Sequence, residues 1–170
     1  MIAMNFESEL KKRISVDRAF DVLVVAESCL PGNHQIRERL EIGNLSIVQA
    51  ANRQIAIRSI RNKIPDLILI DLNMNKQEGI ALLKTIRISY SMRELPVIIM
   101  ASENMNIVEA LSSGANDYFM NSVDSVDSVD LDVLWTSICN QLLQEKPVQQ
   151  FSSSQESLEK KLKCPIDLIK

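Results

Sequence analysis

The residue with the clearest chemical potential is Asp71, which directly follows the aliphatic run 67–70, Leu-Ile-Leu-Ile. Such an unbroken run is typical of a strand that is buried on both faces of a parallel sheet. Open α/β sheets place their ligand sites at the carboxyl ends of the strands, which is where Asp71 would lie. A carboxylate there can bind a metal ion, accept a phosphoryl group or cap the next helix. The surrounding residues are needed to distinguish these three roles.

The elements that would position Asp71 follow a regular order along the chain. Apolar runs that suit buried strands alternate with segments whose apolar residues recur at helical spacing. This alternation predicts a parallel sheet with helices on both faces and right-handed crossovers. We expect Gly114 to end the fourth helix at a C′ position. The expected strands are residues 21–26, 45–50, the segment ending at Asp71, 96–101 and 116–120, and the expected helices are residues 31–41, 52–63, 80–88, 106–113 and 131–144.

The chain is expected to have one folded domain, over residues 21–146, with an extension at each end. In the N-terminal extension, residues 1–20, apolar residues recur every four positions, which predicts a short helix outside the sheet. Residues 147–170 form a Gln/Ser-rich linker and a tail that is too short for a second core, and that could equally be the stub of a longer protein. The repeated Val-Asp-Ser of residues 123–130 is expected to lengthen the loop before the last helix.

Charge and composition argue against several function classes. The net charge of −3 gives no electrostatic reason to expect nucleic-acid or membrane binding. There is no apolar run of membrane-spanning length and no secretory signal, so a cytoplasmic protein is expected. The cysteines form no paired metal-binding motif; we expect Cys139 to be a small buried hydrophobe and His34 a surface residue. The basic residues of the second helix are interpreted as a solvated surface: Arg53, Arg58, Arg61 and Lys63.

Taken in order, these segments resemble the receiver domain of two-component response regulators over residues 21–145. The resemblance rests on Val22-Leu23-Val24-Val25 before the family's acidic pair and on Asp71-Leu72-Asn73-Met74 with Gly79 after it. It also rests on Leu95-Pro96-Val97-Ile98-Ile99-Met100 and on Ser113-Gly114-Ala115-Asn116-Asp117-Tyr118. It implies a flavodoxin-like (βα)5 fold, a doubly wound parallel sheet with strand order 2-1-3-4-5. It also implies a signalling module rather than an enzyme.

The resemblance implies a role for each residue of the site. Asp71 occupies the position of the phosphoacceptor. Glu27, Asp71 and the backbone carbonyl of Asn73 would be ligands of Mg²⁺, a hard cation that binds oxygen and neutralises the transferring phosphoryl group. Ser102 and Tyr118 are the candidates for the hydroxyl and the aromatic residue that respond to phosphorylation, although packing is the preferred interpretation of Tyr118, because a switch presupposes modification.

Several positions depart from the family pattern. Ala26 stands where the first acid is expected, Ala101 where the hydroxyl is expected, and Asn121 where the lysine is expected. Loss of an acid should lower the affinity for Mg²⁺. Loss of the lysine removes a contact worth about 1.5–3 kcal/mol, the usual range for a hydrogen bond to a charged group. Ser102 could replace the hydroxyl only if its strand has already ended, because neighbouring strand positions face opposite sides.

These observations lead to a first hypothesis of an atypical receiver that acts through protein–protein contacts. Its expected partners are a histidine kinase or phosphotransfer protein and, through the fourth helix, fifth strand and fifth helix (residues 107–113, 117–120 and 131–142), a downstream signalling protein or a second copy. One alternative is a fully phosphorylatable relay receiver that uses Mg²⁺ and Asp71. A flavodoxin-like carrier of FMN is disfavoured, because no loop rich in Ser, Thr and Gly follows the first strand.

Overall fold

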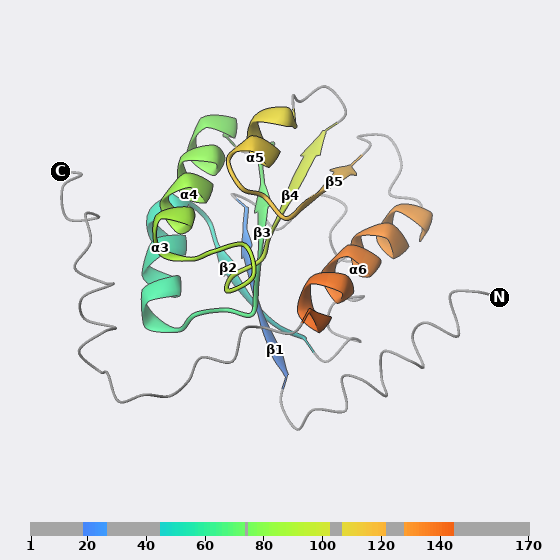
Figure 1. The fold of residues 1–170 in the computed structure, drawn as a ribbon, viewed down its shortest axis with the longest axis horizontal. Helices are drawn as coiled ribbons and strands as arrows, with labels where there is room; N and C mark the ends of the chain where they lie inside the picture. Colours follow the sequence, from blue (N-terminus) through green and yellow to red (C-terminus); the bar gives the residue numbers. More distant parts are fainter. Residues whose placement is uncertain (1–18, 27–44, 74, 103–106, 122–127, 145–170) are drawn as a thin grey trace.

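The computed structural model describes residues 19–26, 45–73, 75–102, 107–121 and 128–144. These residues form a five-stranded parallel sheet with helices on both faces (Figure 1). The elements are β1 (Phe20–Val25), β2 (Leu45–Ala50), α3 (Arg53–Asn62), β3 (Leu67–Asp71), α4 (Lys76–Ser89), β4 (Val97–Ser102), α5 (Val108–Ser112), β5 (Asp117–Asn121) and α6 (Ser128–Leu143). The helices predicted in residues 1–20 and 31–41, and the predicted linker and tail, lie outside the described residues.

The strands lie in the order β2-β1-β3-β4-β5, and each neighbouring pair is parallel. The central strand β3 is buried at every position, as its aliphatic sequence predicts. Val25 of β1 pairs with Ile70, and Met100 of β4 pairs with Asp71. The predicted flavodoxin-like order 2-1-3-4-5 is confirmed, with strand bounds that differ from the predicted ones by one residue at most ends.

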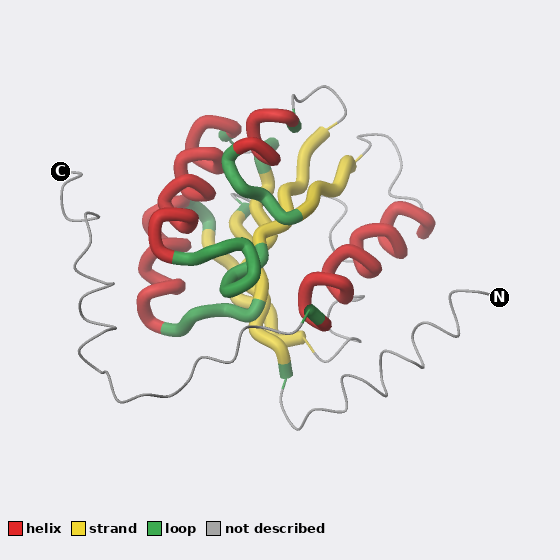
Figure 2. Tube along the Cα trace, viewed as in Figure 1, coloured by secondary structure: helices red, strands yellow, loops and turns green. Residues whose placement is uncertain are grey.

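Side chains alternate across each strand, so the core is divided into two apolar layers. One layer packs against α6 and includes Leu69, Met100 and Phe119. The other includes Ile70 and packs against α3, α4 and α5. Figure 2 shows these three helices on one side of the strands and α6 on the other. Cys139 lies in the α6 layer as a buried residue, as predicted, and burial raises the pKa of its thiol to about 12.

Asparagine side chains begin two of the helices. The side-chain oxygen of Asn52 accepts a hydrogen bond from the backbone N–H of Ile55, and that of Asn75 accepts from the backbone N–H groups of Gln77 and Glu78. These bonds satisfy N–H groups that have no partner within the helix. Because Asn75 is a cap, α4 begins at Lys76, and the prediction of a helix starting at residue 80 was wrong by one turn.

Two other predicted helices have different bounds. The helix α5 covers only Val108–Ser112, and it ends as predicted: Ser113 is the C-cap, and Gly114 follows with a φ of 98°. The last helix, α6, begins at Ser128, so the end of the Val-Asp-Ser repeat is helical rather than part of a loop. A three-residue repeat carries no helical periodicity of its own, so the sequence pattern did not indicate this start.

The basic surface predicted on α3 is only partly solvated. The helix buries Ala56 and Ile60 against the core, whereas Ile55 is 41 % exposed. Arg53 was expected in a solvated surface, but its side chain is half-buried and donates to the hydroxyl of Thr85 on α4 at 3.4 Å. Arg58 remains exposed, as predicted.

Arg87 of α4 holds together the end of the sheet where β4 and β5 begin. Its guanidinium donates to the carbonyl oxygens of Gly114 (2.7 Å) and Leu95 (2.9 Å) and to Oδ1 of Asn116 (2.9 Å). The same Asn116 oxygen accepts from the backbone N–H of Val97, the first residue of β4. A planar donor with several N–H groups can satisfy these acceptors together, which explains an arginine at this half-buried position.

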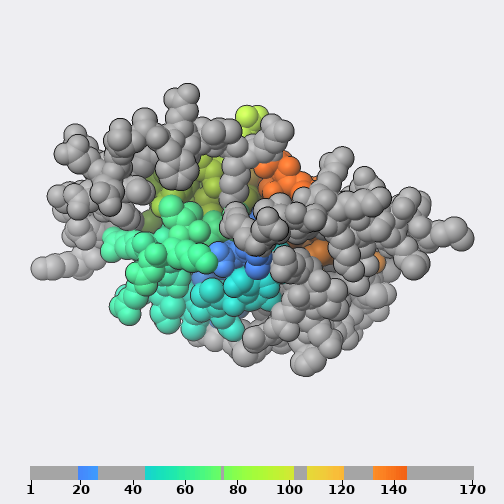
Figure 3. All heavy atoms as spheres, turned by 90° about the horizontal axis from the view of Figure 1, so that it is seen from below, coloured from blue at the N-terminus to red at the C-terminus, as the bar shows by residue number. Residues whose placement is uncertain are grey.

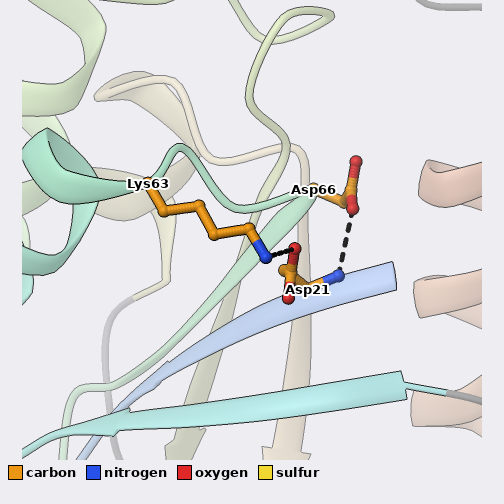
Figure 4. Close-up of polar contacts among 3 residues, drawn as sticks. All are labelled: Asp21, Lys63 and Asp66. Atoms are coloured by element: carbon orange, nitrogen blue, oxygen red, sulfur yellow. Dashed lines mark hydrogen bonds and ion pairs between the residues drawn. The ribbon is translucent and has the colours of Figure 1, made fainter. Parts of the chain in front are cut away.

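A second polar cluster ties β1 to β3 at this same, amino-terminal edge of the sheet (Figure 4). The side chain of Asp66, just before β3, accepts a hydrogen bond from the backbone N–H of Asp21 at 3.0 Å. Lys63 forms an ion pair with Asp21 at 2.6 Å. Seen from below, atoms of β1 lie next to those of β2 and α3 (Figure 3). Because the strands are parallel, this cluster lies at the opposite edge from Asp71 and takes no part in that site.

Candidate functional site

Asp71 ends the central strand and lies between apolar neighbours. Val25 pairs with Ile70, so Ala26, which directly follows β1, lies next to Asp71 along the sheet. On the other side Asp71 pairs with Met100, whose carbonyl accepts a hydrogen bond from the backbone N–H of Leu72 at 2.8 Å. Ala26 and Met100 are both buried in the layer that packs against α6. The carboxylate of Asp71 is therefore flanked by two apolar residues, Ala26 directly after β1 and Met100 in β4.

The environment of the carboxyl group disfavours its charge. Asp71 is only 9 % exposed, and burial raises its pKa above the ordinary value. The backbone N–H of Asn73 donates to Oδ1 at 2.8 Å, and this bond, together with one from the Asn73 side chain, opposes the effect of burial without cancelling it. Within the described part of the chain, no lysine or arginine forms an ion pair with Asp71.

The proposed ligands of a divalent cation are described only in part. Asp71 supplies one carboxylate, and Asn73 follows two residues later, bonded to it through its backbone N–H. Glu27 lies outside the described residues, so its predicted approach to Asp71 stays a prediction. No group of three His, Cys, Asp or Glu side chains that could hold a metal occurs among the residues that were placed. The oxygen donors present suit Mg²⁺ in type, but a second carboxylate would have to come from Glu27.

The residue at the position where the family has a hydroxyl is Ala101, in β4. Ala101 is fully buried, in the layer that packs against α3, α4 and α5. The strand continues through Ser102, which pairs with Asn121 at the end of β5. The early strand end that would let Ser102 take the place of the missing hydroxyl is therefore not found.

Tyr118 lies on the edge strand β5, opposite Ile99 of β4. Its side chain is 43 % exposed, whereas the next residue, Phe119, is buried in the core. Tyr118 is therefore not part of the buried core, and both its packing role and its switch role stay predictions. An aromatic residue on the surface of an edge strand is accessible to a binding partner, and its conformation is not dictated by the core.

The structural roles of two residues near this site were not predicted from the sequence. Asn75 is the N-cap of α4. Asparagine is a preferred N-cap residue, so its type already favoured this role. Gly79 is buried inside α4 against Leu72 and Ile70, a close approach that no local pattern revealed.

Comparison with known proteins decides the family. The model of the response regulator receiver domain matches residues 24–131, more than half of the chain. The chain belongs to this family. As expected for it, the sheet order and the position of Asp71 at the carboxyl end of β3 agree with the resemblance seen in the sequence.

The receiver is similar to several characterised proteins. It is 33 % identical over 111 residues to the transcriptional regulatory protein ZraR of Klebsiella oxytoca, covering 64 % of this chain and 24 % of that protein. It is 31 % identical over 87 residues to the transcriptional regulatory protein KdpE of Staphylococcus aureus, covering 50 % of this chain and 36 % of that protein. The chain thus spans about a quarter to a third of the length of these relatives.

A solved two-component response regulator from Clostridium difficile has the same fold, with a TM-score of 0.60 at 23 % identity, covering 74 % of this chain and 97 % of that one. Together these matches establish a receiver domain of two-component signalling. Such domains are generally non-enzymatic signalling modules and typically bind Mg²⁺ at the phosphorylation site. In the described part of the receiver, no helix is both long and apolar enough to cross a bilayer.

Proposed function

We propose that this receiver is an atypical one, in which contacts with a partner protein, more than phosphorylation of Asp71, determine the signalling state. The observation that carries the proposal is the environment of Asp71. Asp71 is buried between Ala26 and Met100, and its pKa is raised. No cation forms an ion pair with Asp71 among the described residues. Phosphoryl transfer to a carboxylate requires that the incoming negative charge be neutralised, and these neighbours cannot do so.

Two departures from the family pattern, Ala26 and Asn121, also disfavour Mg²⁺ binding and phosphorylation of Asp71. With Ala26 in place of an acid, a divalent cation loses one carboxylate ligand and has to depend on Asp71, Glu27 and the carbonyl of Asn73. With Asn121 in place of a lysine, a phosphoryl group on Asp71 lacks a charge-assisted contact. Mg²⁺ binding is therefore expected to be weak, and phosphorylation slow or absent. A histidine kinase or phosphotransfer protein remains the expected upstream partner.

The surface for the downstream partner is proposed on α5, β5 and α6. Two residues of α5, Val108 and Leu111, and two of β5, Tyr118 and Met120, are exposed although they are large and apolar. β5 is an edge strand of the sheet, so a partner can approach it without displacing another described strand. Contacts on this side could select one conformation of β5 in the absence of a phosphoryl group.

A binding experiment with a phosphoryl analogue tests the proposal. The receiver is titrated with beryllofluoride in the presence of Mg²⁺, and amide NMR spectra are recorded beside those of Asp71→Asn. We expect no Asp71-dependent shifts at a few millimolar Mg²⁺. Saturable shifts that vanish in Asp71→Asn would contradict the proposal and support the relay alternative, for which the retained Asp71 at the end of β3 is the favourable observation. Acetyl phosphate, with intact mass as readout, provides a second check.

A gain-of-function variant sharpens this test. Ala26→Asp adds a carboxylate beside Asp71, and combining it with Asn121→Lys adds the missing cation. We expect the double variant to bind Mg²⁺ and beryllofluoride at least about tenfold more tightly than the natural chain, since one charge-assisted contact is worth about 1.5–3 kcal/mol. The matched control is Ala51→Asp with Asn140→Lys, which adds the same pair of charges at exposed positions after β2 and in α6. Equal binding by the natural chain and the double variant would show that the altered positions do not limit the site.

A further inference from the structure

An apolar patch is exposed beside the edge strand. Val108 and Leu111 of α5 are 68 % and 41 % exposed, and Tyr118 and Met120 of β5 are 43 % and 42 % exposed. We call these four residues the α5–β5 patch. They are close together for two reasons: only four residues separate α5 from β5, and Ala110 of α5 packs in the layer that contains Ile99 and Ala101, the β4 residues paired with Tyr118 and Met120.

The stretch of sequence that contains the patch has acidic residues and no basic ones. Residues 94–145, which include β4, α5, β5 and α6, contain nine acidic residues and no lysine, arginine or histidine. Residues 53–93, which include α3 and α4, contain eight basic and three acidic residues. These two stretches of sequence thus have opposite net charge, although the net charge of the whole chain is only −3. In Figure 1 the acidic segments α5, β5 and α6 follow one another around the end of the sheet away from β2.

This charge distribution opposes a symmetric dimer through the patch. In a two-fold interface the same surface of each copy faces the other, so acidic residues would meet acidic residues. The only cation seen to reach α5 from the described residues is Lys76 of α4, which forms an ion pair with Glu109 of its own chain at 3.0 Å. Like charges at close range disfavour association, and no basic residue of residues 94–145 could relieve the repulsion.

We propose that the α5–β5 patch binds an amphipathic, lysine- or arginine-rich segment of a partner protein, with the apolar side of that segment on the patch. This proposal rests on the proposed function, because it specifies the partner of the surface assigned there. Apolar contacts would supply the affinity, and the acidic surroundings would select basic partners and speed their approach.

Other occupants fit these observations less well. The basic α3–α4 side of a second copy has the right charge, but Lys63 and Lys76 are already paired with Asp21 and Glu109 of the same chain. Such a head-to-tail contact also extends into a filament unless the copies close into a ring. The chain's own residues 158–170 contain Lys160, Lys161 and Lys163, and the test below distinguishes them from a partner.

The test uses a probe peptide of about 18 residues, long enough to form a helix, with leucines at helical spacing along one side and lysines flanking them. A twin peptide has glutamates in place of the lysines. Each is titrated into the full chain, without phosphoryl analogue, and amide shifts are followed by NMR. We expect the lysine peptide to bind with shifts centred on the patch, and the glutamate twin to bind at least about tenfold more weakly. Raising the salt concentration from about 50 to 300 mM should weaken binding of the lysine peptide, since exposed charges are then screened.

Variants of exposed residues complete the test. Leu111→Ser should weaken binding of the lysine peptide by about tenfold or more, whereas Ile88→Ser, a matched change on the exposed side of α4, should leave it unchanged. Equal binding of the two peptides, or shifts centred outside the patch, would overturn the proposal. So would a concentration-dependent dimer in sedimentation that Leu111→Ser abolishes, or shifts at the patch caused by reversing the charge of Lys160, Lys161 and Lys163 alone.

These outcomes are independent of the phosphoryl-analogue experiment. A receiver that responds fully to beryllofluoride could still bind the lysine peptide at the patch, and an unresponsive receiver could fail to bind it. The failure of either proposal is therefore recognised separately.

Discussion

The backbone N–H of Asn73 donates a hydrogen bond to Oδ1 of Asp71 at 2.8 Å, yet the pKa of Asp71 is raised. Burial is the dominant cause, and the bonds from Asn73 only reduce its effect. A carboxyl group whose pKa is higher in the folded than in the unfolded state stabilises the fold when it is protonated and loses that contribution as the pH rises through the folded-state pKa. At pH values above the ordinary pKa of aspartate, Asp71 is therefore a cost to stability that the site retains.

The first prediction follows from the raised pKa of Asp71. We expect Asp71→Asn to have a higher free energy of unfolding than the natural chain at pH 7.5. The difference should shrink as the pH falls toward about 3.9, the ordinary value for aspartate. Urea denaturation at several pH values measures it, and Glu78→Gln, at an exposed position of α4, is the control. A difference that grows on acidification would show that the carboxylate, and not the acid, is the form favoured by the fold.

The second prediction concerns Gly79, which lies inside α4 against the core. An added Cβ would overlap Cδ2 of Leu72 and lie 3.3 Å from Cγ2 of Ile70. Alanine normally stabilises a helix interior by about 1 kcal/mol relative to glycine. Here we expect Gly79→Ala to lower the free energy of unfolding by roughly 1–2 kcal/mol, because Leu72 is fully buried and overpacking forces it to move.

A double-mutant cycle checks this cause. Leu72→Ala alone should cost about 2–5 kcal/mol, and the combined variant should cost less than the two single changes together, because the space left by Leu72 admits the new methyl group. Gln77→Ala, an exposed change in the same helix, controls for helix propensity. Additive costs would mean that the overlap with Leu72 is not what makes glycine necessary.

The third prediction concerns the end of α5. Gly114 has a φ of 98°, where a residue with a Cβ is strained, and an added Cβ would lie 3.0 Å from Cγ of Arg87. We expect Gly114→Ala to destabilise the fold by about 1–2 kcal/mol. Ser113→Ala, whose backbone is in the right-handed helical region, should change stability by less than half of that. Thermal unfolding of the two variants compares them directly.

The fourth prediction concerns Arg87. A lysine at this position can make only part of the contacts with Gly114, Leu95 and Asn116, because its ammonium lacks the planar, forked arrangement of donors. We expect Arg87→Lys to lower the free energy of unfolding by about 2 kcal/mol or more, since partly buried acceptors then lose their donors. Lys84→Arg on the exposed side of α4 is the matched control. A change of less than about 0.5 kcal/mol in Arg87→Lys would mean that water replaces the missing donors at no cost.

The sequence by itself determined the alternation of strands and helices. The aliphatic run before Asp71 indicates a buried strand because burial on both faces requires apolar side chains in succession. Gly114 indicated the end of α5 for an equally local reason, the positive φ that follows a helix. The strand order, however, came from the family resemblance, because the spatial neighbours of a strand do not follow from its own residues.

Only the tertiary structure decided the character of the site. The flanking of Asp71 by Ala26 and Met100 depends on the register of three strands that are far apart in the chain. The raised pKa, the exposure of Tyr118 and the packing of Gly79 against Leu72 have the same origin. Burial and solvation are set by residues distant in sequence, whereas helix caps and strand runs are set by neighbours along the chain.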